Sequence, residues 1–135
     1  MSPTIAFNVS SSVRGALAAP LARSLGCDQD TAAIVVDDMQ RFLYLCGTSA
    51  VPLTPSRAID AAWHLLIGDH ERYEAFCRSA CGRTIPHLKL TDKAVLAANR
   101  QRAEALSFEI FGRPLDSKPD EVDADCGSCC SSDGC

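Results

Sequence analysis

The sequence PSRAIDAAWHLLIGDHERYEAFCRSACGRTIPH, residues 55–87, decides the fold and carries most of the chemistry of this chain. It contains all three histidines, the only tryptophan, one of the two tyrosines and two of the eight cysteines. Its apolar residues recur at helical spacing on both sides of a central glycine, which predicts two consecutive helices, Pro55 to Ile67 and Asp69 to Ala80. Thr54 is the expected N-cap of the first helix, and Gly82 the expected C-cap of the second.

Further helices are predicted on both sides of this stretch. From Asp30 to Cys46, apolar residues recur at i, i+4, i+7 and i+11, which is typical of an amphipathic helix that Gly47 can end. Thr91 can cap a long helix that Gly112 stops, with its inward face formed by Leu96, Ala103, Leu106 and Ile110. A shorter amphipathic helix is expected before Cys27, and only Thr4 to Val9 resembles a strand. We therefore expect an all-α bundle of four to five helices.

The composition changes at the C-terminal end of the chain. Residues 115–135 are rich in Asp, Ser, Gly and Cys and lack hydrophobic periodicity, which predicts a disordered tail after a helical domain of residues 1–114. This tail has six acids and one lysine, so it accounts for a charge of −5 and the helical domain for +1, within a total of −4.

Charge and hydropathy exclude several classes of partner. A nearly neutral domain lacks the basic face that nucleic-acid binding requires, so no nucleic-acid partner is expected. No apolar run approaches the roughly 18 residues that span a bilayer, and no polybasic anchor is present, so no membrane partner is expected. The N-terminal residues do not resemble an export signal, which predicts a cytoplasmic protein in a reducing compartment. Cysteine clusters there bind metals or carry out redox chemistry more often than they form structural disulfides.

The strongest candidate site begins with Asp60 and His64, which share a helix face because they are four residues apart. A carboxylate that accepts one imidazole N–H orients the ring and leaves its other nitrogen to bind a metal ion or act as a base. His87, beyond the Gly82 turn, can complete a metal site with them. The alternative is a half-buried hydrogen bond that helps to seat Trp63 in the core.

Cys77 is a further candidate ligand. With Cys81 four residues later, and with His64 and His87, it could form a Cys2His2 zinc site, although zinc sites usually use a Cys-x2-Cys turn. The alternative is that Cys77 is a small core residue, since cysteine is among the most buried residue types.

The tail carries a second thiol cluster in the sequence CGSCCSSDGC. Its cysteines are suited to Cu(I) or Zn(II), and the candidate ligands are Cys126, Cys129, Cys130 and Cys135. An alternative function follows from the same cluster: the chain could be a precursor or carrier protein whose tail is the substrate of a modifying enzyme.

Signatures of common catalytic sites are absent from the sequence, including the P-loop, the dinucleotide-binding glycine pattern, the nucleophile elbow and HExxH. A small metal-binding or metal-handling protein, with Zn or Cu as the expected metal, is therefore the leading prediction, and we do not expect an enzyme. A hydrolase-like or redox enzyme that uses His64 as its base ranks last, because the sequence places no nucleophile beside this histidine.

The pattern PSxxIDxAWHLLI, followed by Tyr, Phe-Cys and GRTIPH, resembles the conserved part of the bacterial glycine-rich domain-containing proteins, an uncharacterised group related to plant glycine-rich domain proteins. The match covers roughly Val35 to His87. The chain has Leu66 where many relatives have a second helix histidine. The resemblance implies that Asp60, His64 and His87 are site residues, and it implies no reaction. Its most specific positions are Pro55, Ser56, Asp60, Trp63, His64, Tyr73, Cys77, Gly82, Ile85 and His87.

Overall fold

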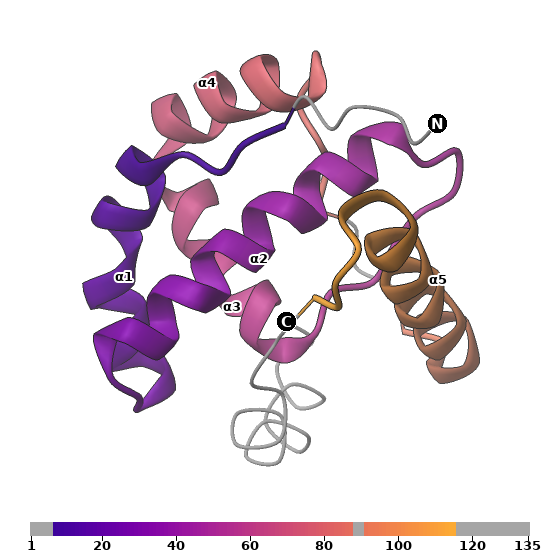
Figure 1. The fold of residues 1–135 in the computed structure, drawn as a ribbon, viewed down its shortest axis with the longest axis horizontal. Helices are drawn as coiled ribbons and strands as arrows, with labels where there is room; N and C mark the ends of the chain where they lie inside the picture. Colours follow the sequence, from indigo (N-terminus) through magenta and orange to yellow (C-terminus); the bar gives the residue numbers. More distant parts are fainter. Residues whose placement is uncertain (1–6, 88–90, 116–135) are drawn as a thin grey trace.

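The computed structural model describes residues 7–87 and 91–115, and all the regular secondary structure in this part of the chain is helical (Figure 1). The helices are α1 (Ser11–Leu25), α2 (Gln29–Thr48), α3 (Arg57–Gly68), α4 (His70–Cys81) and α5 (Lys93–Phe111). The predicted all-α bundle is confirmed. Residues 7–9 do not form a strand, contrary to the strand-like pattern in the sequence.

The central helix of the bundle is α2, which runs diagonally through the middle of the molecule and packs against each of the other four helices (Figure 1). Its inward face contributes the fully buried Met39, Phe42 and Leu43, around which α1, α3 and α4 close. The last described residue, Leu115, is also buried in this core. The predicted tail beyond it lies outside the described residues.

Two helix starts differ from the sequence prediction by one or two residues. The N-cap of α3 is Ser56, whose hydroxyl accepts the Ile59 N–H at 3.2 Å. The Thr54 hydroxyl, predicted as this cap, is buried without a hydrogen-bond partner among the described residues. The N-cap of α5 is Asp92 and not Thr91, because one Asp92 carboxylate oxygen accepts two backbone N–H groups, at 2.9 and 3.1 Å. A carboxylate near a helix N-terminus is also favoured by the helix dipole.

The inward face of α5 also differs from the prediction. Its buried residues are Asn99, Ala103 and Ser107, while Leu96, Leu106 and Ile110 are half-buried. The Ser107 hydroxyl donates to the Arg113 carbonyl at 2.7 Å, so its burial is compensated by a hydrogen bond. The predicted helix end at Gly112 is confirmed: this residue has a left-handed φ of 73°.

Gly47 does not end α2, which continues to Thr48. Its role is to allow close packing, because a Cβ atom at this position would lie 2.9 Å from the Cβ of Cys81. The end of α4 therefore rests directly on the backbone of α2. This contact fixes the position of the chain that leaves α4 toward His87.

We expect Gly47→Ala to lower the free energy of unfolding by about 1–3 kcal/mol, since the added methyl group overpacks a contact between two helices. Gly15→Ala is the matched control, because nothing lies within 4 Å of a Cβ atom at that helical position. That control should raise stability by about 0.5–1 kcal/mol through the higher helix propensity of alanine. Urea unfolding of both variants measures the difference, and equal stabilisation by both substitutions would contradict the packing role of Gly47.

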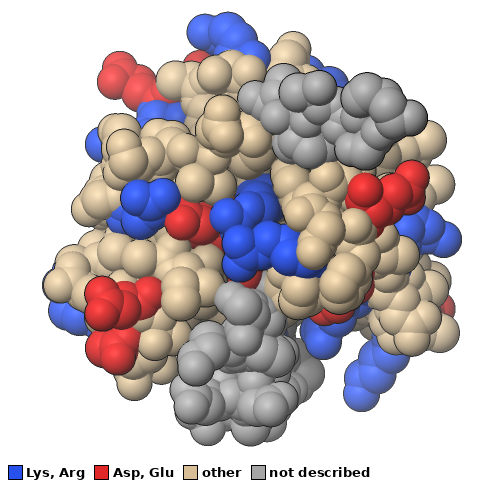
Figure 2. All heavy atoms as spheres, in the orientation of Figure 1, with Lys and Arg blue, Asp and Glu red and all other residues tan. Residues whose placement is uncertain are grey.

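The surface of the bundle carries charges of both signs. On the face shown in Figure 2, basic and acidic side chains are interspersed. The ion pairs of the bundle include Arg14–Asp37 and Arg41–Asp38, each at 2.9 Å. Among the described residues, no helix combines the length and hydropathy needed to cross a bilayer.

Candidate metal site

Asp60 and His64 lie one helical turn apart on α3, as the sequence predicts. Asp60 belongs to the first turn of the helix, where the dipole favours a negative charge, and the residue is only 7% exposed. The His64 side chain is 47% exposed and its Nδ1 lies 3.3 Å from Oδ2 of Asp60. The pair therefore has a buried carboxylate on one side and a solvent-facing imidazole on the other.

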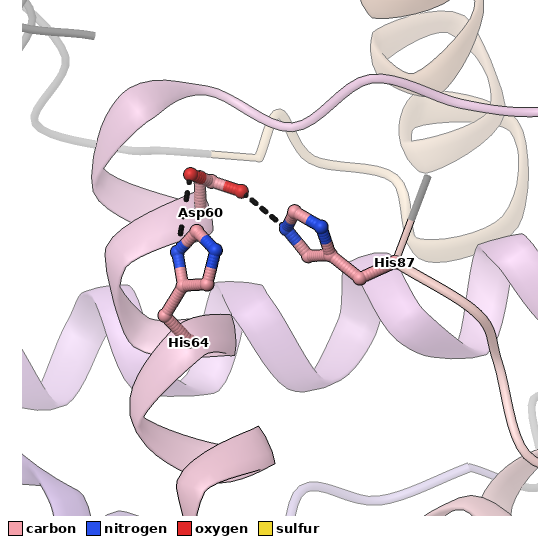
Figure 3. A group of neighbouring side chains, drawn as sticks. All are labelled: Asp60, His64 and His87. Carbon is pink, nitrogen blue, oxygen red and sulfur yellow. Dashed lines mark hydrogen bonds and ion pairs between the residues drawn. The ribbon is translucent and has the colours of Figure 1, made fainter. Parts of the chain in front are cut away.

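His87 reaches the same carboxylate from a different part of the chain, the segment after α4 that has no regular secondary structure. Its Nε2 lies 2.7 Å from Oδ1 of Asp60, and its side chain is 17% exposed. Figure 3 shows that each imidazole ring faces a different oxygen of the carboxylate. The ring centroids of His64 and His87 are 4.5 Å apart.

These three side chains form a group that could hold a metal ion. Each offers one ligand atom, and the three atoms lie within 4.8 Å of one another. No other group of three His, Cys, Asp or Glu side chains in the described part of the chain meets this condition. Two imidazole nitrogens and a carboxylate oxygen are ligands typical of zinc and of other divalent transition metals.

Aromatic side chains of the core pack against His87. The Trp63 ring is buried and lies against His87, with centroids 4.3 Å apart. Beneath it, Phe42 of α2 contacts Trp63 edge to face, with centroids 5.6 Å apart. The position of His87 therefore depends on the packing of the core as well as on its hydrogen bond to Asp60.

Hydrogen bonds anchor the segment that carries His87. The Trp63 indole N–H donates to the Tyr73 hydroxyl at 3.1 Å, and that hydroxyl donates to the Ile85 carbonyl. Ile85 is itself buried. Because Ile85 is two residues before His87, this chain of contacts fixes the backbone that delivers the second histidine.

Cys77, the fourth predicted body ligand, is not part of the Asp60, His64 and His87 group. It is fully buried on α4, one helical turn before Cys81. The structure therefore does not assemble the Cys2His2 set considered from the sequence. The helical i, i+4 spacing of Cys77 and Cys81 brings the two sulfurs together and directs them toward α2, where Cys81 Sγ lies 3.4 Å from the Leu43 carbonyl.

The surroundings of Cys77 favour a thiolate. Interaction with the Cys81 thiol is the largest cause of a lowered pKa at Cys77, which falls from 9.0 to about 6 against the opposing effect of burial. The hydrogen bond to Cys77 and burial raise the pKa of Cys81. Burial raises the pKa of the nearby Cys46 to about 12. Cys77 is therefore the preferred site of the negative charge in this thiol cluster, which consists of Cys46, Cys77 and Cys81.

This depressed pKa predicts a pH dependence of stability. Between pH 6 and 9 the unfolded Cys77 binds a proton that the folded protein does not, so the free energy of unfolding should rise with pH in this range. The contribution is complete above pH 9 and is lost as the pH falls through 6. Urea unfolding across this range measures it, with Cys77→Ser as the control that lacks the rise. Parallel pH profiles for the two proteins would contradict a thiolate at Cys77.

The remaining histidine lies apart from the group of Asp60, His64 and His87. His70, the third histidine, is on the surface of α4 beside Glu74, at 3.2 Å, and does not belong to the site. The four predicted tail ligands are outside the described residues. They are Cys126, Cys129, Cys130 and Cys135.

Comparison with known proteins places this chain in a family. The model of the UCP032817-like family matches residues 12–118, which include all of α2 to α5 and all but the first residue of α1. The chain belongs to the UCP032817-like family. The resemblance to bacterial glycine-rich domain-containing proteins is therefore wrong as an assignment. That resemblance covered roughly residues 35–87, with its most specific positions between residues 55 and 87, whereas the UCP032817-like match spans residues 12–118.

The description of the UCP032817-like family names no ligand or activity. No curated protein matches the chain, and no solved structure matches it. Inferences about the function of this UCP032817-like protein therefore depend on its own residues.

Proposed function

We propose that this protein binds a divalent transition-metal ion through Asp60, His64 and His87. The observation that supports this proposal is the convergence of three ligand atoms within 4.8 Å, contributed by α3 and by a segment 27 residues further along the chain. Asp60 is almost fully buried, and a buried carboxylate requires compensation by hydrogen bonds or by a cation. Two histidines provide hydrogen bonds, and a metal ion bound among all three side chains would replace these bonds with a cation.

Two of the three distances between ligand atoms fit an ion after small movements. Two ligand atoms bound to one tetrahedral zinc ion at about 2.0–2.2 Å are roughly 3.3 Å apart. The corresponding separations from Asp60 are 2.7 Å to His87 and 3.3 Å to His64, so these two pairs need shifts of less than an ångström. The exposed ring of His64 provides the side from which an ion enters.

The ligand set also indicates the class of metal. Imidazole and carboxylate suit Zn(II) and Fe(II), whereas Cu(I) prefers thiolates. Three protein ligands leave at least one position for water or another small ligand, which distinguishes this arrangement from a closed structural zinc site with four protein ligands. We therefore expect an exchangeable ion, and Zn(II) is the first ion to test.

Calorimetric titration with Zn(II) tests the proposal. The protein is the full chain without a histidine tag, with its four tail cysteines replaced by serine so that they do not compete for the ion, and it is first treated with a chelator. We expect one ion per chain, an affinity that rises with pH because protons compete for the imidazole nitrogens, and a higher melting temperature. His70→Ala is the control histidine and should bind equally well. If Zn(II), Fe(II) and Co(II) neither bind to the protein nor stabilise it, the proposed function is refuted.

A further inference from the structure

The candidate metal site takes its ligands from two parts of the chain, and one residue of a third part joins these two. Asp60 and His64 belong to α3, whereas His87 belongs to the segment that follows α4. Tyr73 lies on α4, which contributes no residue to the site. Its hydroxyl is hydrogen-bonded to one residue of each part that carries ligands.

These two hydrogen bonds are shielded from solvent. The Tyr73 hydroxyl accepts the indole N–H of Trp63 at 3.1 Å and donates its proton to the Ile85 carbonyl. Trp63, Tyr73 and Ile85 are only 3%, 6% and 4% exposed. Water therefore does not readily take the place of this hydroxyl, and its removal would take a partner from two buried polar groups.

Both hydrogen-bond partners of Tyr73 lie close to candidate ligands. Trp63 directly precedes His64 in α3, and its ring lies against His87 with centroids 4.3 Å apart. Ile85 is two residues before His87, in a segment without regular secondary structure. Such a segment lacks the repeating backbone hydrogen bonds of a helix, so the bond from Tyr73 supplies a constraint on His87 that local structure does not.

Metal binding makes this constraint more important. In the structure, His87 Nε2 also lies 2.7 Å from Oδ1 of Asp60. Two ligand atoms on one zinc ion are roughly 3.3 Å apart, so an ion bound between these atoms replaces their direct hydrogen bond. The contact with Trp63 and the hydrogen bond at Ile85 then remain to direct the His87 imidazole toward the ion.

We propose that Tyr73 is a positioning residue of the metal site, which holds His87 at ligand distance from Asp60 and thereby sets the affinity for the ion. It acts through Trp63 and Ile85 and not through contact with the metal. The effect on affinity rests on the proposed function, whereas the effect on the position of His87 does not. Outer-shell residues contribute about 10–100-fold to metal affinity, and we expect the lower end because Tyr73 acts through the backbone.

Tyr73→Phe tests this role, because it removes the hydroxyl and keeps the buried ring. The protein is the full chain without a histidine tag and with its four tail cysteines replaced by serine. Calorimetric titration should show Zn(II) affinity lower by about tenfold, with one ion per chain as before. Circular dichroism measures whether the variant keeps its helical fold.

Ser107→Ala is the matched control for lost stability. It also removes a buried hydroxyl that donates to a backbone carbonyl, that of Arg113 at 2.7 Å, but on α5. This variant should unfold at a lower urea concentration than the parent protein and bind Zn(II) equally well. If both variants lose affinity equally, general destabilisation explains the loss and the positioning role of Tyr73 is overturned.

A double-mutant cycle with His87→Ala identifies the ligand through which Tyr73 acts. In the His87→Ala background, Tyr73→Phe should leave the residual binding by Asp60 and His64 unchanged, because the ligand that it positions is already absent. A tenfold loss in both backgrounds would mean that Tyr73 acts on the site without His87, which contradicts the proposal.

Nuclear magnetic resonance of the metal-free protein separates this inference from the proposed function. In Tyr73→Phe, the imidazole signals of His87 should move toward those of the exposed His70, whose own signals should stay unchanged. Unchanged His87 signals overturn the positioning role whether or not a metal binds. If the His87 signals move in a protein that binds no Zn(II), Tyr73 still positions His87 and the proposed metal function fails.

Discussion

His87→Ala should weaken Zn(II) binding by more than about 100-fold, because outer-shell residues of metal sites already contribute about 10–100-fold and His87 is proposed to bind the ion directly. Its imidazole is closer to Asp60 than that of His64, at 2.7 against 3.3 Å, and it is less exposed. Without His87, the site retains only two ligands, Asp60 and His64, which lie four residues apart on α3. Calorimetric titration of the variant with Zn(II) measures the loss.

Two further variants make this prediction specific. Asp60→Asn keeps the shape of the side chain but removes its charge, and should also weaken binding strongly. His70→Ala removes the remaining histidine, which lies on the surface beside Glu74, and should leave affinity and stoichiometry unchanged. Equal losses for His87→Ala and His70→Ala would indicate nonspecific binding to surface histidines and would contradict the proposed site.

Phe42→Ala should lower the free energy of unfolding by about 3–5 kcal/mol, the usual cost of removing a large aromatic side chain from a core. Phe42 is fully buried on α2 and contacts Trp63. The loss is a large share of the roughly 5–15 kcal/mol that stabilises a typical domain. Urea unfolding followed by circular dichroism measures it.

Phe108→Ala provides the comparison, since Phe108 is 55% exposed on α5 and its removal should change stability by less than about 0.5 kcal/mol. Trp63 emission should change in Phe42→Ala because Trp63 loses its neighbour, and should be unchanged in Phe108→Ala. Comparable destabilisation of the two variants would contradict the assignment of Phe42 to the core beneath the site.

Much of this architecture could be predicted from local patterns. The spacing of Asp60 and His64 was sufficient to place them on one helix face, and Gly82 and Gly112 correctly marked two helix ends. The choice between adjacent caps was harder, because Thr54 and Ser56 belong to the same class of capping residue. Only the path of the chain into the core decides that Ser56 reaches a backbone N–H while Thr54 is buried.

The parts that could not be predicted depend on contacts between distant residues. The sequence predicts a helix end at Gly47, yet this residue lies within α2, where Cys81 packs on its backbone. Cys77 was a plausible partner for His87 by its chemistry. It is instead fully buried on α4 and does not belong to the group of Asp60, His64 and His87, and this follows from the packing of α4 in the core.

The separation of the two histidine ligands along the chain has a topological consequence. An ion bound to α3 and to His87 would close a covalent and coordinate loop that contains the whole of α4. Such a closure stabilises the enclosed helix by limiting the open conformations that the loop can reach, as a cross-link does. Binding of an ion to the site should therefore slow proteolytic cleavage and amide exchange within α4, although α4 contributes no ligand.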